Sequence, residues 1–100
     1  METLVQAPES DPNPTTIKEV LAALRKQKLE PTHAAKNWGD WIYLEGSQTV
    51  ISIESIRGLT TSATIEHAEN EPNDPTPAIL QAFHKIGWVG MDEDGEYPLG

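Results

Sequence analysis

The strongest constraint on the fold is a stretch in the middle of the chain where apolar and polar residues alternate with a period of two. Three such runs follow one another at residues 41–45, 49–54 and 62–67, and they are rich in β-branched and aromatic residues. Side chains of a β-strand point alternately to opposite faces, and these residue types favour strands. Turn-forming residues connect the runs at 46–48 and 57–60. This pattern predicts a three-stranded antiparallel meander.

The alternation sorts the side chains of this meander into two faces of different character. One face is consistently apolar and is expected to be the core; it holds Ile42, Leu44, Ile51, Ile53, Ala63 and Ile65. The other face holds Trp41, Tyr43, Val50, Ser52, Glu54, Thr64 and Glu66. Two interpretations of this second face remain open. Either the chain ends fold over it and make a second small core, or its aromatic residues form an exposed binding platform.

Two segments with helical spacing flank the predicted strands. The first begins with a capping box formed by Thr16 and Glu19 and is expected to run to about Lys28. The second is expected to have Thr76 as its cap and Gly87 as its left-handed terminator. Each segment carries one apolar stripe: Ile17, Val20, Leu21 and Leu24 in the first, and Ile79, Leu80, Phe83 and Ile86 in the second.

The remaining segments are expected to be connections and ends. Residues 31–39 are predicted to form a loop, and residues 88–99 a short hairpin or a strand with a tail. Residues 1–14 contain three prolines among small and acidic residues, so we expect a disordered, acidic and proline-rich tail. The predicted fold is a single α+β domain over residues 15–99. It is a two-layer sandwich in α-β-β-β-α order, with both helices on one face of an antiparallel sheet.

The composition excludes several classes of protein. There is no cysteine, which removes disulfides, thiolate metal sites and cysteine nucleophiles. No apolar run approaches the roughly 18 residues of a membrane-spanning helix, and the first residues do not resemble a secretory signal, so we expect a cytoplasmic location. The net charge of −9 repels phosphate backbones and anionic lipids. Neither nucleic acid nor a membrane is therefore expected as a partner.

The predicted order of elements, helix, three strands and helix, also occurs in double-stranded RNA-binding domains. Those domains present lysines at the start of their last helix, where they reach phosphates across a groove. The matching stretch here holds Glu69, Glu71 and Asp74 instead. The chain therefore does not match that family.

No sequence pattern points to an active site. The five serines lie outside any nucleophile-elbow context, and His33, His67 and His84 share no spacing typical of a zinc site. The acidic segment Asp92–Glu96 has the acid density of a calcium loop, but its glycine is fourth rather than sixth. We expect no catalytic residue, metal or cofactor. A calcium- or magnesium-binding domain remains the alternative, and a small hydrolase or transferase a more distant one.

The acidic residues gather towards the end of the chain, since residues 66–100 hold eight of them against one lysine. A helix and a strand of similar length are expected to bring the two acidic segments of this region to one end of the molecule. The sequence therefore predicts a small non-enzymatic interaction or regulatory module that presents a carboxylate-rich surface to a basic protein partner. The oligomeric state does not follow from the sequence. The expected binding residues are Trp41, Tyr43, Glu69, Glu71, Asp74, Asp92, Glu93, Asp94 and Glu96.

Overall fold

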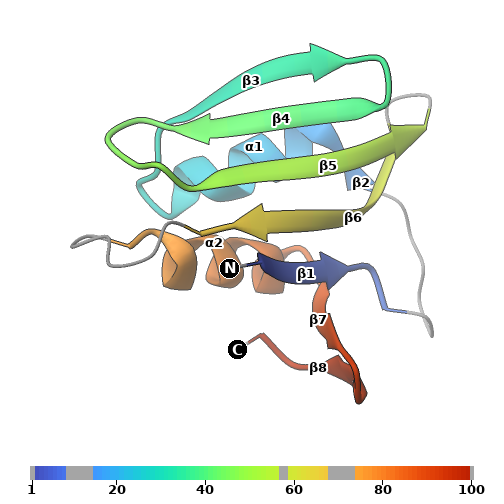
Figure 1. The fold of residues 1–100 in the computed structure, drawn as a ribbon. Coiled ribbons are helices and arrows are strands. Elements are labelled where there is room, and N and C mark those ends of the chain that lie inside the picture. The colour runs from blue at the N-terminus through green and yellow to red at the C-terminus, as the bar shows by residue number, and fades with distance from the viewer. Residues whose placement is uncertain (1, 9–14, 57–58, 68–73, 100) are drawn as a thin grey trace.

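The structure, a computed structural model, describes residues 2–8, 15–56, 59–67 and 74–99, which form a small α+β fold (Figure 1). The strands are β1 (Glu2–Gln6), β2 (Thr15–Thr16), β3 (Pro31–Lys36), β4 (Gly39–Leu44), β5 (Val50–Ile56), β6 (Leu59–Glu66), β7 (Val89–Asp92) and β8 (Gly95–Tyr97), and the helices are α1 (Ile17–Lys26) and α2 (Thr76–Lys85). In these residues the strands make one antiparallel sheet in the order β3-β4-β5-β6-β1-β7-β8, and β2 pairs with β6. Figure 1 shows both helices behind this sheet.

The predicted meander is present as β4, β5 and β6. Ile42 lies opposite Ile51, and Ile51 lies opposite Ile65, so three β-branched side chains form one row across the strands. Every side chain predicted for the core face of the meander is buried. The register of the three strands therefore follows from the burial of one apolar face.

Two segments that were expected to lack regular structure form strands. Residues 31–36, predicted as part of a loop, are the edge strand β3 and pair with β4. Residues 2–6, predicted as part of a disordered tail, are β1 and pair with β6 on one side and β7 on the other. The expectation is wrong for both segments, because backbone pairing on a neighbouring strand orders them despite their weak apolar pattern. Residues 9–14 of the expected tail lie outside the described residues.

Helix α1 begins as predicted and ends earlier. The hydroxyl oxygen of Thr16 accepts a hydrogen bond from the backbone N–H of Glu19 at 3.2 Å. The helix ends at Lys26, and a Schellman turn places Lys28 in the left-handed region with a φ of 64°. A residue other than glycine costs about 1–2 kcal/mol in that conformation. The Schellman turn thus ends the helix before the chain reaches Pro31, and the proline is not what stops it.

Helix α2 ends as predicted but begins differently. Thr76 is the first helical residue and not the cap; its backbone N–H and its hydroxyl both donate to the carboxylate of Asp74, at 3.0 and 2.6 Å. At the other end, Gly87 has a φ of 85°, and the N–H of Trp88 donates to the carbonyl of Phe83 at 3.0 Å. These bonds form a Schellman motif, which turns the chain back towards β7.

The core lies between the sheet and the pair of helices. Leu24 of α1 and Phe83 of α2 are buried in the same cluster as the core face of the meander. Trp88 joins them, since its ring stacks on Phe83 with centroids 4.9 Å apart. Its indole N–H donates to the hydroxyl oxygen of Thr15 at 3.2 Å, so the polar edge of this buried ring is satisfied.

Candidate functional site

The face of the sheet that points away from the helices, called here the open face, carries an aromatic strip. Trp41 and Tyr43 lie on this face of β4, with ring centroids 5.9 Å apart. Trp38, in the turn between β3 and β4, makes an edge contact with Trp41 at 6.0 Å. Tyr43 is 42% and Trp38 47% exposed, so no described segment covers the strip. Among the described residues, the aromatic strip of Trp38, Trp41 and Tyr43 is therefore partly exposed and does not form a second core.

The cross-strand register explains a hollow beside the aromatic strip. One row of side chains on the open face runs through Trp41, Ser52, Thr64, Leu4 and Met91, from β4 to β7. The residues in the middle of this row are small and those at its ends are large. The sheet surface is therefore hollowed above the small residues, and the hollow has a volume of about 370 Å³.

Carboxylates lie beside this hollow and along the next row. Glu54 lines the hollow directly. Glu66 of β6 lies directly opposite Glu2 of β1, and like charges in this position repel each other. In the part of the chain that the structure describes, none of these three forms a salt bridge, since the ion pair found there joins His33 and Asp40. The open face is therefore both aromatic and negatively charged.

A further pair of carboxylates lies where β4 ends. The backbone N–H of Glu45 donates to the carbonyl of Glu30 at 3.2 Å. A side-chain hydrogen bond and the negative charge of Glu45 raise the pKa of the Glu30 carboxyl. The register of β4, β5 and β6 places Tyr43 and Glu66 at this same end of the sheet. Negative charge therefore continues from the open face around its end.

The two acidic segments that were expected to meet lie apart as far as they are described. Asp74 precedes α2, whereas the Asp92–Glu96 segment forms the tip of the β7–β8 hairpin. Figure 1 shows this tip at the lower right, far from the start of α2. Glu69 and Glu71 lie outside the described residues. The structure therefore does not bring the described members of the predicted acidic surface together.

The acidic hairpin tip has an ordinary structural role. The carboxylate of Asp92 accepts a hydrogen bond from the backbone N–H of Asp94 at 2.8 Å, which closes the turn. Within residues 2–8, 15–56, 59–67 and 74–99, no three histidine, aspartate or glutamate side chains are placed to hold a metal ion. The geometry of the donors in this part of the chain gives no support to the cation-binding alternative.

Asp74 also has a structural role, at the end of a polar chain that joins β1 to α2. The hydroxyl of Thr3 lies 2.6 Å from Nε2 of His67, and the hydroxyl of Thr76 lies 3.2 Å from Nδ1. Since Thr76 gives its hydroxyl proton to Asp74, it accepts from Nδ1–H, and Nε2 accepts from Thr3. The bonds from the hydroxyl and backbone N–H of Thr76 lower the pKa of the Asp74 carboxyl.

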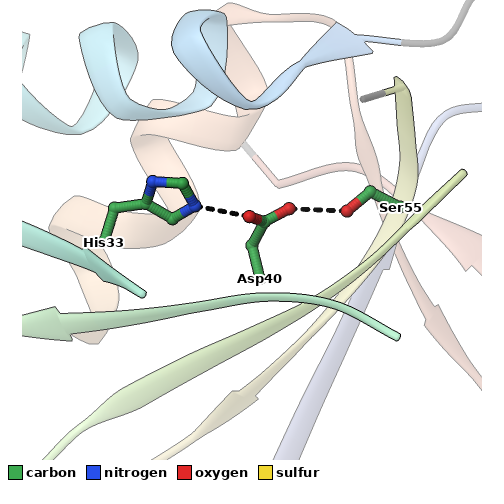
Figure 2. Close-up of polar contacts among 3 residues, drawn as sticks. All are labelled: His33, Asp40 and Ser55. Carbon is green, nitrogen blue, oxygen red and sulfur yellow. Dashed lines mark hydrogen bonds and ion pairs between the residues drawn. The ribbon is translucent and has the colours of Figure 1, made fainter. Parts of the chain in front are cut away.

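A second polar cluster, on the helix side of the sheet, has the composition of a catalytic triad but not its arrangement. Figure 2 shows Asp40 between His33 and Ser55. Nε2 of His33 contacts one carboxylate oxygen, and the hydroxyl of Ser55 donates to the other at 2.5 Å. In a triad the histidine lies between the other two and takes the proton of the nucleophile. Here the serine proton points to the carboxylate, so His33 is in no position to activate Ser55.

The pKa of Asp40 agrees with a structural role for this cluster. Burial raises the pKa of the carboxyl, but hydrogen bonds from Ser55 and His33, with the charge of His33, outweigh burial and hold the pKa below its usual range. Such a carboxylate is a poor base. The hydrogen bonds from His33 and Ser55 compensate for the burial of the Asp40 carboxylate on the core side of β4. They also link β4 to β3, which holds His33, and to β5, which holds Ser55. Asp40 lies two residues before Ile42 and four before Leu44, so it shares their apolar face of β4. A charged residue at such a position is the feature of the sequence that indicates this cluster.

The substitution Asp40→Asn is expected to destabilise the protein at pH 7 by about 1–3 kcal/mol, because it replaces the charged acceptor of the hydrogen bonds from His33 and Ser55 with a neutral amide. The folded pKa of Asp40 is lowered. Its stabilising contribution is therefore complete above the unfolded pKa of about 4 and is lost as the pH falls through the folded value. Urea unfolding of both proteins at pH 7 and at about pH 2 measures this difference. An equal difference at both pH values would contradict the assignment, and the exposed Glu54→Gln serves as the control.

Neither the lengths of the helices nor comparisons with known proteins give further information on this site. Neither helix of the described residues is long and apolar enough to cross a membrane. Searches for a matching protein family, a similar characterised protein or a similar solved structure find no match to this chain.

Proposed function

We propose that this protein is a non-enzymatic interaction module that binds a basic protein partner through the open face of its sheet. The observation that carries the proposal is the exposed aromatic strip beside the carboxylates of Glu2, Glu54 and Glu66. No described segment covers this face. A partner that is both apolar and cationic complements it.

The aromatic strip has the properties of an interface centre. Tryptophan and tyrosine are the residues that most often dominate binding energy in protein interfaces. Two of the rings stand on β4, which is paired with β3 and β5 on its two sides. The strip is therefore held in place before a partner arrives, and little conformational entropy is lost on binding.

The charge distribution favours a basic partner at this face. Lys36, at one edge of β3, is the only lysine or arginine of the described strands. The exposed basic residues of the helix layer are Lys18, Arg25, Lys26, Lys28 and Lys85, on or beside α1 and α2. The negative field therefore points out of the sheet and not out of the helices, and it steers a positively charged protein towards the aromatic strip. The aromatic residues then have the main role in binding the partner, and the acidic tip of the β7–β8 hairpin has a minor one.

Affinity capture from a native lysate, with surface variants as bait, tests the proposal. Trp41→Ala and Tyr43→Ala are each expected to weaken binding of the captured protein at least about tenfold, as truncation of an interface anchor does. Lys26→Ala, an exposed change on α1, is the matched control and should leave binding unchanged. Capture should also weaken at high salt, since exposed charges contribute less there.

Two outcomes would refute this proposal. One is a partner that binds both open-face variants as tightly as it binds the wild-type protein. The other is a large loss of folding stability in both variants, which would show that the aromatic strip is packed and not free to bind.

A further inference from the structure

The hollow beside the aromatic strip is lined by a carboxylate. Among the described residues that line it are Glu54 and no lysine, arginine or histidine. The Glu54 side chain is exposed, and it forms no salt bridge within the described residues. The negative charge of Glu54 attracts a cationic group and repels an anionic one.

Trp38 forms one rim of the hollow and is held there by the backbone. It belongs to the two-residue turn between Lys36 and Gly39, which pair across β3 and β4. Gly39 has a φ of 156°, and a Cβ atom at this position would lie 2.0 Å from the carbonyl oxygen of Ile53. Only glycine permits this close approach of β4 to β5. The turn is thus fixed against the sheet, and the edge contact with Trp41 places the indole of Trp38 beside the hollow.

The opposite side of the hollow is apolar and its middle is polar. Leu4 of β1 and Met91 of β7 supply the apolar side, and the hydroxyls of Ser52 and Thr64 lie between them and the aromatic strip. The volume of about 370 Å³ is within the range of sites that bind small ligands. The hollow can therefore take a long side chain with an apolar stem and a charged end.

From these features we infer that the hollow binds an arginine side chain of the basic partner, an inference that rests on the proposed function. The guanidinium plane stacks on the indole of Trp38, while its N–H groups donate to the carboxylate of Glu54. The methylene stem lies along Leu4 and Met91. Arginine fits better than lysine, because a planar guanidinium stacks and donates at the same time and is more weakly hydrated than an ammonium group.

Short capped peptides of glycine and serine with one central residue test this inference. The central residue is arginine, lysine or citrulline, which has the shape of arginine without its charge. The indole N–H signal of Trp38 reports binding in NMR titrations, and that of the buried Trp88 is the internal control. The arginine peptide should shift the Trp38 signal with a Kd of about 1 mM or tighter. The lysine peptide should bind several-fold more weakly, and the citrulline peptide at least about tenfold more weakly.

Substitutions within the hollow separate the two contacts. Glu54→Gln should weaken the arginine peptide about tenfold and leave the citrulline peptide unchanged. Trp38→Ala lacks the reporting indole, so its titrations are followed by the backbone N–H signals of Ser52 and Thr64, which line the same hollow. It should weaken both arginine and citrulline peptides, because both stack on the indole. Glu19→Gln, an exposed change of the same kind on α1, is the control and should change neither. Equal binding of arginine and citrulline, no saturable shift of the Trp38 signal, or an unchanged Kd in Glu54→Gln would overturn the inference.

The same variants distinguish failure of this inference from failure of the proposed function. If the captured partner needs Trp41 and Tyr43 but tolerates Glu54→Gln and Trp38→Ala, the open face binds a partner without an arginine in the hollow. The inference then fails and the proposed function stands. If the arginine peptide binds the hollow while the captured partner ignores every open-face variant, the proposed function fails instead.

Discussion

Deletion of residues 1–7 is expected to unfold the protein. These residues contain β1, which lies inside the sheet between β6 and β7. The hairpin of β7 and β8 joins the sheet through β1, so the deletion detaches it and leaves residues 62–66 of β6 without a partner on that side. It also removes the buried side chains of Val5 and Ala7. The combined loss is of the same order as the roughly 5–15 kcal/mol that stabilises a domain of this size.

Circular dichroism and thermal unfolding of the truncated protein measure this effect. A melting temperature within a few degrees of the wild-type value would show that residues 1–7 are a dispensable tail. Two point variants make the test independent of chain length. Val5→Asp puts a charge at a side chain that is 1% exposed and should abolish stable folding, whereas Leu4→Asp, at a side chain that is 50% exposed on the other face, should be tolerated.

The central meander was predictable because its information is local. Ile42, Ile51 and Ile65 belong to runs in which every second residue is apolar, and such a run has only one orientation that buries its apolar side. The same alternation places Trp41 and Tyr43 on the opposite face. Whether that face is exposed depends on which other segments pack over it, and a local sequence pattern does not contain this information.

Strands β1 and β3 were not predictable in this way. Val5 is the single buried position among residues 2–6, and β3 has no buried residue at all. These segments are strands because β6, β7 and β4 offer them backbone hydrogen bonds. The partners of β1 in β6 lie about sixty residues away along the chain, whereas β3 pairs with β4 across a two-residue turn. Periodicity reports burial, whereas it does not report pairing with a distant segment.

Because β1 was not predicted as a strand, the expectation about the acidic surface was also wrong. The chain was expected to return beside α2 after Gly87 and to bring the Asp92–Glu96 segment level with the start of that helix. Instead β1 lies between β6 and β7, so the hairpin joins the sheet one strand further out. Figure 1 shows the tip of this hairpin away from the start of α2. The hollow on the open face was missed for the same reason, since Leu4 of β1 forms part of it.

The substitution Trp88→Ala is expected to lower the free energy of unfolding by about 3–5 kcal/mol, the usual range for removing a buried aromatic side chain. The Trp88 side chain is 2% exposed, and the stack on Phe83 links the end of α2 to the core. Trp88→Phe keeps an aromatic ring in this place but removes the indole N–H that donates to Thr15. Its cost should be smaller, about 1–2 kcal/mol. Urea unfolding followed by circular dichroism measures all of these values.

Trp38→Ala is the matched control for this substitution, because it removes the same side chain from the open face. Its cost should stay below about 1 kcal/mol, since the indole is almost half exposed and contacts only the edge of Trp41 among the aromatic rings of the described residues. A cost equal to that of Trp88→Ala would mean that the aromatic strip is packed as tightly as the core. The strip would then be no surface for a partner, and the binding proposal and the arginine site beside it would both lose their physical basis.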